Sequence, residues 1–284
     1  DNNLGLGHLR LSVIDLSEAA HQPMFDESGR YCIIYNGEIY NYIELRQQLS
    51  SKGLNFFSNS DTEVILKLFI TEGTEAVTKL NGMFSFIIWD KEDRTLFAAR
   101  DRLGIKPFYY HYDKERFVFA SEIKAFFASG LVQPQMNFEG MSDYLIFQFC
   151  LEEKTLFNGI EKLPPGCWLK IGEEGKLDIR KYWQLDFTVD TDHDQQYFEY
   201  KLLRLLEDAV RIQLRADVPV GAHLSGGLDS STVTCMAASL MDAPIHTFSG
   251  GFKEDPRYDE TGYARMTAEH AGSIHHEIFP NEQQ

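Results

Sequence analysis

The alternation of strands and helices in residues 218–279 is the feature that most constrains what this chain can fold into. Short apolar segments at 218–224, 245–249 and 274–279 are predicted as strands, and helices are predicted between them at 230–240 and 261–270. Strands that are joined through helices pair in parallel, with right-handed crossovers. This part of the chain is therefore predicted to be the start of a Rossmann-like parallel α/β domain.

Residues 1–187 have a different pattern, in which apolar runs are separated by short polar turns. The turns at 90–94 and 113–116 predict two antiparallel hairpins, and later apolar runs predict further hairpin strands. Helices are predicted after Asn41 and after Ser60, because each of these residues has a glutamate three positions later that can complete a capping box. Antiparallel strands combined with a few helices indicate an α+β unit of packed sheets.

A polar, acidic segment at 188–196 separates the two patterns and is predicted to be a linker. The chain is thereby divided into residues 1–187, the linker, and residues 197–284. A long helix follows the linker, because apolar residues recur there at helical spacing. These residues are Phe198, Leu202, Leu205, Leu206 and Ala209.

Composition excludes several classes of function. The 27 Lys and Arg residues and 43 Asp and Glu residues give a net charge of −16, whereas a nucleic-acid surface needs a basic face. No apolar run approaches the roughly 18 residues of a membrane-spanning helix, so no membrane partner is expected. The four cysteines form neither a C-x-x-C pair nor a metal-ligand spacing, which predicts reduced thiols in the cytoplasm. They are Cys32, Cys150, Cys167 and Cys235.

The loop SGGLDS, from Ser225 to Ser230, follows the first strand of the parallel part and leads into a helix. Ligands of open parallel sheets bind at the carboxyl ends of the strands. Gly226 and Gly227 would let backbone N–H groups at the helix N-terminus approach an anion. Asp229 would repel a phosphate unless a cation such as Mg²⁺ lay between them, so a pyrophosphate site with Mg²⁺ is predicted. A glycine turn with a helix cap is the alternative.

Two short segments of residues 1–187 could bind the carboxylate and the reacting group of a small substrate. GHLRLS is predicted as a strand with His8 and Arg10 on one face, and the guanidinium of Arg10 could bind a carboxylate. In YNGE, the amide of Asn36 and the backbone N–H of Gly37 follow a strand and could form an oxyanion hole. The alternatives are a surface arginine and an Asn-Gly hairpin turn.

Two acidic residues could bind an ammonium group. Glu38 follows the possible oxyanion hole directly, and Asp61 lies in the segment SDTE. Both carboxylates could contact the same cation. The alternative for SDTE is a capping box that only begins a helix.

Taken in order, these motifs resemble a known family. GHLRLSVIDLS, QPM, NGEIYNYIELR, SDTEVIL, LNGMFSFIIWD, AARDRLGIKPFYY and FASEIKA resemble the amino-terminal glutaminase domain of glutamine-hydrolysing asparagine synthetases. DYLIFQF, TLFNGIEKLPPG, KYW and LSGGLDSS continue the likeness into the synthetase domain, where SGGLDS resembles the pyrophosphatase loop of N-type ATP pyrophosphatases. The resemblance implies a class II glutamine amidotransferase domain, an αββα sandwich of the amino-terminal-nucleophile hydrolase type. A Rossmann-like ATP pyrophosphatase domain would follow it.

The resemblance also implies a role for each candidate residue of the first domain. Arg10 binds the carboxylate of glutamine, and Glu38 and Asp61 bind its α-ammonium group. Asn36 and Gly37 are the catalytic residues that stabilise the tetrahedral oxyanion. The released ammonia passes through an internal tunnel to the second domain.

In the second domain, the resemblance implies that ATP and aspartate form β-aspartyl-AMP, which ammonia converts to asparagine. Substrates are then glutamine, aspartate and ATP, Mg²⁺ is bound at Asp229, and a homodimer is the assembly that the family suggests. Leu224 and Ser249 are expected near the adenine, and the other residues at the pyrophosphate. The implied ATP-site residues are Leu224, Ser225, Gly226, Gly227, Asp229, Ser230 and Ser249.

The chain departs from the family pattern at both ends. The family's nucleophile is an amino-terminal cysteine that lies upstream of Asp1, and further synthetase residues lie beyond Gln284. The chain alone is therefore expected to have neither full glutaminase nor full synthetase activity. Two alternatives stay open. One is a related amide ligase with another acid acceptor, such as a β-lactam synthetase or a sugar- or peptide-modifying enzyme. The other is a non-catalytic protein that binds glutamine and ATP.

Overall fold

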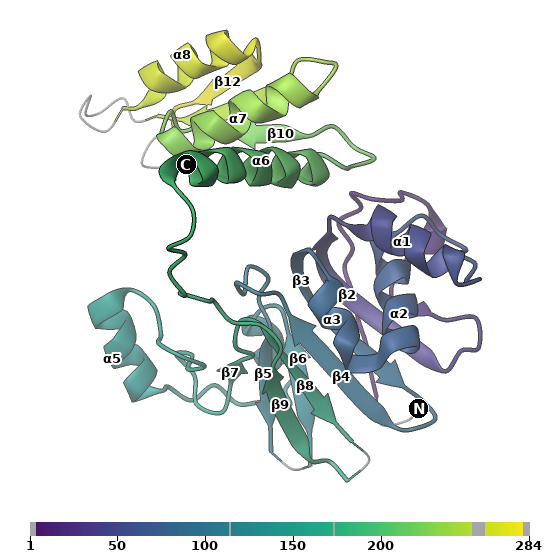
Figure 1. Cartoon of the computed structure of the whole chain (residues 1–284). Coiled ribbons are helices and arrows are strands. Elements are labelled where there is room, and N and C mark those ends of the chain that lie inside the picture. Colours follow the sequence, from purple (N-terminus) through teal and green to yellow (C-terminus); the bar gives the residue numbers. More distant parts are fainter. Residues whose placement is uncertain (1–3, 114, 173, 252–258, 281–284) are drawn as a thin grey trace. The chain divides into compact units, whose positions relative to one another are not determined.

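The computed structural model of the chain describes residues 4–113, 115–172, 174–251 and 259–280. The chain divides into two compact units, residues 1–187 and 188–284 (Figure 1). Each unit is described by itself below.

Residues 1–187 contain two antiparallel sheets. One has six strands in the order β1-β2-β3-β4-β8-β9, and the other has three strands in the order β6-β5-β7. The strands are β1 Met24–Phe25, β2 Tyr31–Ile39, β3 Gly82–Asp90, β4 Thr95–Arg100, β5 Tyr109–Tyr112, β6 Phe117–Ala120, β7 Glu161–Lys162, β8 Cys167–Ile171 and β9 Leu177–Lys181. The two predicted hairpins are confirmed, because β3 pairs with β4 and β5 pairs with β6, each in antiparallel register.

The helices of this unit complete four layers. They are α1 Tyr42–Ser51, α2 Asp61–Glu72, α3 Ala76–Lys79, α4 Lys124–Ala128 and α5 Phe138–Phe147, with 3₁₀ turns η1 Glu18–Ala20 and η2 Gly73–Glu75. Leu45 of α1 and Val64 of α2 pack on one face of the six-stranded sheet. The other face of that sheet packs on the three-stranded sheet through Ile87 and Tyr110. Phe126 of α4 packs on the far side of the three-stranded sheet. The predicted αββα order is confirmed.

Strand β2 passes straight through Asn36 and Gly37, so the turn that was predicted after Tyr35 is wrong. Every residue of β2 pairs with β3. A Cβ atom at Gly37 would lie 2.1 Å from the backbone oxygen of Met83, which means that the two strands approach too closely for any other residue. The long ladder therefore overrides the local preference of Asn-Gly for a hairpin turn.

The strand that was predicted around His8 and Arg10 is also wrong, since residues 4–12 form no strand in the described part of the chain. A strand needs a neighbour that pairs with its backbone groups, and no described strand does so here. The side chains nevertheless alternate as predicted. Leu9 and Leu11 are 100% and 89% exposed, whereas His8 and Arg10 are partly buried.

The helices predicted after Asn41 and Ser60 are confirmed as α1 and α2, but only α2 has its side-chain cap, and its capping box is incomplete because the Glu63 carboxylate accepts the N–H groups of Phe57 and Ser58 instead of that of Ser60. The Ser60 hydroxyl accepts the backbone N–H of Glu63 at 3.3 Å. The side chain of Asn41 instead donates to the carbonyl oxygen of Lys79 and accepts the N–H of Asn81. Asn41 therefore connects the start of α1 to the segment that enters β3.

Residues 188–284 contain a three-stranded sheet in the order β10-β11-β12, and both strand pairs are parallel as predicted. Its elements are α6 Gln195–Gln213, β10 Gly221–His223, α7 Leu228–Leu240, β11 His246–Gly250, α8 Thr261–Ala271 and β12 Ile274–Ile278. The last two residues of the predicted linker thus belong to α6. Among the described residues, no helix has the length and apolar character needed to cross a membrane.

Candidate active site

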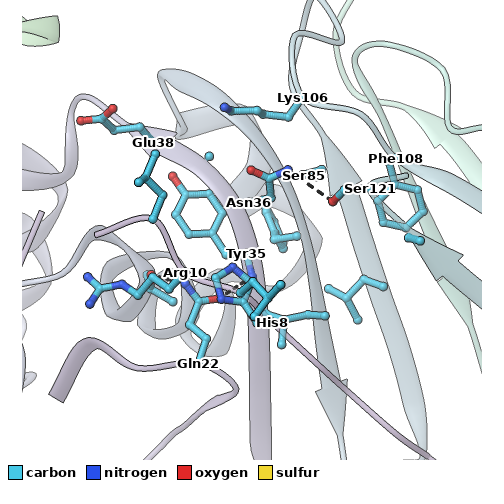
Figure 2. Close-up of a pocket in the computed structure, with 18 of the residues that line it drawn as sticks. His8, Arg10, Gln22, Tyr35, Asn36, Glu38, Ser85, Lys106, Phe108 and Ser121 are labelled. Atoms are coloured by element: carbon cyan, nitrogen blue, oxygen red, sulfur yellow. Dashed lines mark hydrogen bonds between the residues drawn. The ribbon is translucent and has the colours of Figure 1, made fainter. Parts of the chain in front are cut away.

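A cavity of about 840 Å³ in the first unit brings the candidate residues of that unit together (Figure 2). Arg10, Asn36, Gly37, Glu38 and Asp61 all line it, although they come from three separate motifs. Other polar residues that line the cavity include His8, Gln22, Tyr35, Ser85, Lys106 and Ser121.

Asp61 is fixed at one wall of the cavity by strand β2. It is the first residue of α2 and only 6% exposed. One carboxylate oxygen accepts the Tyr35 hydroxyl at 2.8 Å and the backbone N–H of Ile39 at 3.0 Å. These two hydrogen bonds hold the Asp61 carboxylate in one position. Glu38 belongs to the same strand β2, so the two carboxylates lie near each other.

The two carboxylates raise each other's affinity for a positive charge. Burial raises the pKa of Glu38 to about 7, the negative charge of Asp61 adds to this rise, and Lys106 opposes it. Burial also raises the pKa of Asp61, against hydrogen bonds from the Ile39 N–H and the Tyr35 hydroxyl that lower it. A bound ammonium group would favour the ionised form of both carboxyl groups. This wall of the cavity is therefore suited to a cation.

Arg10 supplies a positive charge at another part of the cavity. Its Nη2 donates to the carbonyl oxygens of Ile14 and Asp15, both at 2.6 Å, which fixes the guanidinium. Its Nη1 is buried and has no hydrogen-bond partner among the described residues. A buried N–H group without a partner is costly, and the carboxylate of a ligand would satisfy it.

His8 lies beside Arg10 and is held neutral. Burial lowers the pKa of His8, against a hydrogen bond with the Tyr35 backbone, and the charge of Arg10 lowers it further. Its Nδ1 is buried and unpaired within the described part of the chain. Because His8 is neutral, Arg10 carries the positive charge in this part of the cavity.

Asn36 and Glu38 lie two positions apart on β2, so their side chains belong to the same face of the sheet. Figure 2 shows both at the cavity. Asn36 Nδ2 donates to the Ser121 hydroxyl at 3.3 Å, and the amide group has a second N–H to give. That N–H can stabilise negative charge that develops on a substrate oxygen.

The arrangement is complementary to a zwitterionic amino acid. Arg10 matches a carboxylate, Glu38 and Asp61 match an ammonium group, and the amide of Asn36 lies farther along β2. A free amino acid that carries an additional polar group on its side chain would satisfy all of these groups.

The segment SGGLDS of the second unit follows β10 and leads into α7 as predicted, and its last three residues form the start of that helix. Gly226 has φ +85°, and a Cβ atom there would lie 2.7 Å from the backbone N of Ala264 in α8. The hydroxyls of Ser225 and Ser230 lie 3.0 Å apart. Gly227 is the N-cap residue of α7 and has no side chain that could accept an N–H group of the first turn. The exposed loop thus offers backbone and hydroxyl donors of the kind that bind anions.

The other candidate residues of this loop have less to offer from their side chains. Leu224 is buried against Ala264 and Ala268, and the hydroxyl of Ser249 donates to the Leu224 carbonyl oxygen. Asp229 is exposed in the first turn of α7. Among the described residues, no group of three or more His, Cys, Asp or Glu side chains could hold a metal ion. The assignments of adenine and Mg²⁺ to these residues stay predictions.

Several polar residues of the cavity were not predicted as site residues, among them Lys106, Ser121 and Gln22. Lys106 and Ser121 lie within the quoted segments AARDRLGIKPFYY and FASEIKA, which was the available signal. Gln22 lies in QPM, and its side-chain oxygen accepts the backbone N–H of Tyr35 at 2.6 Å. Spacing along the chain could not reveal these residues, because only the packing of distant segments brings them to β2.

The four cysteines are free thiols, as predicted. None of them lines the cavity. Cys32 is buried in β2, and burial raises its pKa to about 11, so it carries little of the reactive thiolate form at neutral pH. The cavity therefore receives no cysteine nucleophile from the residues of this chain.

Comparison with known proteins identifies the class to which this fold and cavity belong. Residues 1–183 match the family model of the glutamine amidotransferase domain. That match covers more than half of the chain, and the chain belongs to this family. Residues 201–284 match the family described as asparagine synthase.

Individual relatives narrow the class further. The chain is 40% identical to asparagine synthetase [glutamine-hydrolyzing] 1 of Bacillus subtilis, over 99% of this chain and 44% of that protein. It is 37% identical to asparagine synthetase [glutamine-hydrolyzing] 3 of the same organism, over 97% of this chain and 47% of that protein. It is 35% identical to amidase chry2 of Gibberella zeae, over 100% of this chain and 44% of that protein. The chain spans about half the length of the curated relatives it matches.

Proposed function

We propose that this chain takes part in the ATP-dependent synthesis of asparagine from aspartate, with ammonia that is released from glutamine. The cavity of the first unit is the observation that carries the glutamine part. Arg10 binds the α-carboxylate, and Glu38 and Asp61 bind the α-ammonium group. The side-chain amide then reaches Asn36 and Gly37, whose N–H groups stabilise the oxyanion.

The second unit would use ATP to activate the carboxylate of aspartate. The anion donors of Ser225–Ser230 and the close packing at Gly226 support a pyrophosphate site there. Asp229 is the residue that would hold Mg²⁺, and Leu224 and Ser249 would lie near the adenine. ATP supplies the adenylyl group that turns the carboxylate into β-aspartyl-AMP, an acyl group with a good leaving group. Ammonia then displaces AMP to give asparagine.

The setting of this reaction is also a proposal. Four free thiols support a cytoplasmic location, since disulfides are rare there. A homodimer is the assembly that we propose for the active enzyme. A relative named as an amidase supports a second candidate, in which the same chemistry serves another acid acceptor.

Loss of the Arg10 guanidinium is expected to weaken glutamine binding by about 100-fold, because it removes a charge-assisted pair and leaves the substrate carboxylate unpaired. Calorimetric titration of the chain and its Arg10→Met variant with L-glutamine measures this. Arg180→Met is the matched control, because Arg180 is exposed on β9 and pairs with Asp178 instead. If the chain fails to bind L-glutamine, or binds D-glutamine equally well, the proposal is wrong.

The chain is expected to bind glutamine without hydrolysing it. Its four cysteines lie outside the cavity, so none of them is expected to act as the nucleophile. An ammonia-release assay with L-glutamine checks this expectation. Ammonia formed at an enzymatic rate would mean that another residue of this chain is the nucleophile.

A further inference from the structure

The loop between β4 and β5 is built around one buried carboxylate. Asp101 is 1% exposed. One of its oxygens accepts the backbone N–H groups of Leu103 and Ile105 at 3.1 and 2.9 Å. The other accepts those of Phe84 and Lys106 at 3.2 and 2.9 Å. A single carboxylate therefore determines the backbone conformation of the loop, and its hydrogen bond with the Phe84 N–H connects the loop to β3.

A partly buried guanidinium fixes the same loop from its other side. Arg100 donates to the carbonyl oxygens of Lys106, Gly104 and Leu163 at 2.7, 2.8 and 2.7 Å. The backbone N–H of Lys106 thus bonds to one charged side chain and its carbonyl oxygen to another. Charge-assisted hydrogen bonds are roughly twice as strong as neutral ones, so both polar groups of the Lys106 backbone are held firmly in place.

The side chain of Lys106 extends from this rigid base into the cavity. It lines the same space as Glu38, and Figure 2 shows its ammonium group on the side of the cavity toward Glu38. Within the described part of the chain, Lys106 forms no ion pair or hydrogen bond through its ammonium group. The positive charge of Lys106 therefore acts on Glu38 through the electrostatic field and not through a direct contact.

The charges of the occupied cavity balance only when Lys106 is included. Glutamine contributes one positive and one negative charge. Arg10 contributes one positive charge, and Glu38 and Asp61 contribute two negative charges when both are ionised. These sum to −1, and Lys106 brings the sum to zero. An unbalanced charge in a partly buried site is costly.

We propose that Lys106 is a positioning residue of the glutamine site, which keeps Glu38 ionised so that Glu38 can receive the α-ammonium group of the substrate at neutral pH. This inference rests on the proposed function. The pKa of Glu38, raised to about 7 by burial and then by Asp61, is opposed by Lys106. The titratable and charged groups of the cavity around Glu38 are Asp61 of α2, Tyr35 and Tyr40 of the β2 segment, Lys106, and His8 and Arg10 across the cavity. Glu122 and Lys124 also line it, and their charges cancel in an ion pair.

Removal of the Lys106 charge is expected to raise the pKa of Glu38 and to weaken glutamine binding near neutral pH. Without Lys106 the pKa of Glu38 rises further, so less Glu38 is ionised near neutral pH and the ammonium group loses a partner. Glutamine binding is therefore expected to weaken several-fold at about pH 7 and to stay nearly unchanged at about pH 8.5, where Glu38 is mostly ionised in both proteins. The affinity that depends on Glu38 is lost as pH falls, and in the variant this loss begins at a higher pH.

The test is the pH dependence of L-glutamine binding to the chain and to Lys106→Met, measured by calorimetry between about pH 6 and pH 8.5. Lys106→Arg should restore the original profile. Lys124→Met is the matched control, because Lys124 borders the same cavity but is 81% exposed and pairs with Glu122 at 2.6 Å. A carbon-detected NMR titration of Glu38 adds a readout that does not depend on binding.

The outcomes separate this inference from the proposed function. No binding by the unaltered chain would overturn the proposed function itself. Binding by the unaltered chain, with the same pH profile in Lys106→Met and Lys124→Met, would overturn only the role of Lys106. If Lys106→Met is poorly folded, Lys106→Gln removes the same charge with a polar side chain, and the same comparison decides.

Discussion

Gly37→Ala is expected to destabilise the first unit by about 3–5 kcal/mol, the largest effect of any single methyl group that we foresee. The added Cβ would lie 2.1 Å from the Met83 oxygen and 2.7 Å from the Phe84 Cα. Both atoms belong to the backbone of β3, which is paired on its other side with β4. Neither strand can move without breaking a ladder. Urea unfolding of the variant and the parent chain measures the difference.

Gly29→Ala is the control for this substitution. Gly29 has φ +70°, and a Cβ there would meet nothing within 4 Å, so the variant isolates the cost of the backbone conformation at about 1 kcal/mol. Equal losses in the two variants would show that close approach of the strands is not what requires glycine at position 37. The glutamine affinity of Gly37→Ala should also fall, since Asn36 and Glu38 flank the site of the collision.

Asp101→Asn is expected to cost about 3–5 kcal/mol and to weaken glutamine binding in addition. Asparagine keeps one oxygen, but its NH₂ group would face two of the four backbone N–H donors that the carboxylate now accepts. Those donors would be buried without partners, and Arg100 would lose the neighbouring negative charge. Thermal unfolding and calorimetric titration with L-glutamine measure the two effects.

Asp113→Asn is the matched control for Asp101→Asn. Asp113 accepts the N–H groups of Glu115 and Arg116 in the β5–β6 turn, and its side chain is about a third exposed. Water can replace the lost hydrogen bonds there, so we expect a cost below about 1 kcal/mol and unchanged glutamine binding. A small effect at Asp101 would mean that the loop does not depend on the buried carboxylate.

The elements that the sequence predicted correctly are those with a strong local signal. Polar turns separate the strands of both hairpins, Ser60 caps α2, and Gly272 ends α8 in a left-handed conformation with φ +63°. The parallel pairing of β10, β11 and β12 followed from the helices between them. In each case the residues that decide the structure are close together in the sequence.

The predictions that were wrong depended on distant neighbours. Asn36–Gly37 has the local chemistry of a turn, but the backbone of β3 makes it part of a strand. The segment of His8 and Arg10 has the alternation of a strand, but no described strand pairs with it. Which strands pair in a sheet depends on distant segments of the chain and cannot be predicted from the residues of one strand alone.

The candidate site was predictable in its residues but not in its electrostatics. Motifs placed Arg10, Glu38 and Asp61 in one site, and the structure brings them to one cavity. Lys106 was not foreseen, because its proposed role depends on a loop that is fixed by the charged side chains of Asp101 and Arg100. The sequence alone does not show which groups surround the ammonium group of a lysine.

The straight course of β2 through Asn36 to Glu38 has a consequence for which amino acid can react. Two residues on one face of a strand are about 7 Å apart, and this interval cannot change while both strands of the ladder remain paired. Under the proposed roles, that interval separates the Cα atoms of Glu38, one partner of the ammonium group, and Asn36, one of the donors to the oxyanion. A substrate must then span a fixed length. Asparagine, shorter by one methylene group, could reach one end or the other but not both, so the strand itself would exclude the product from being consumed as a nitrogen donor.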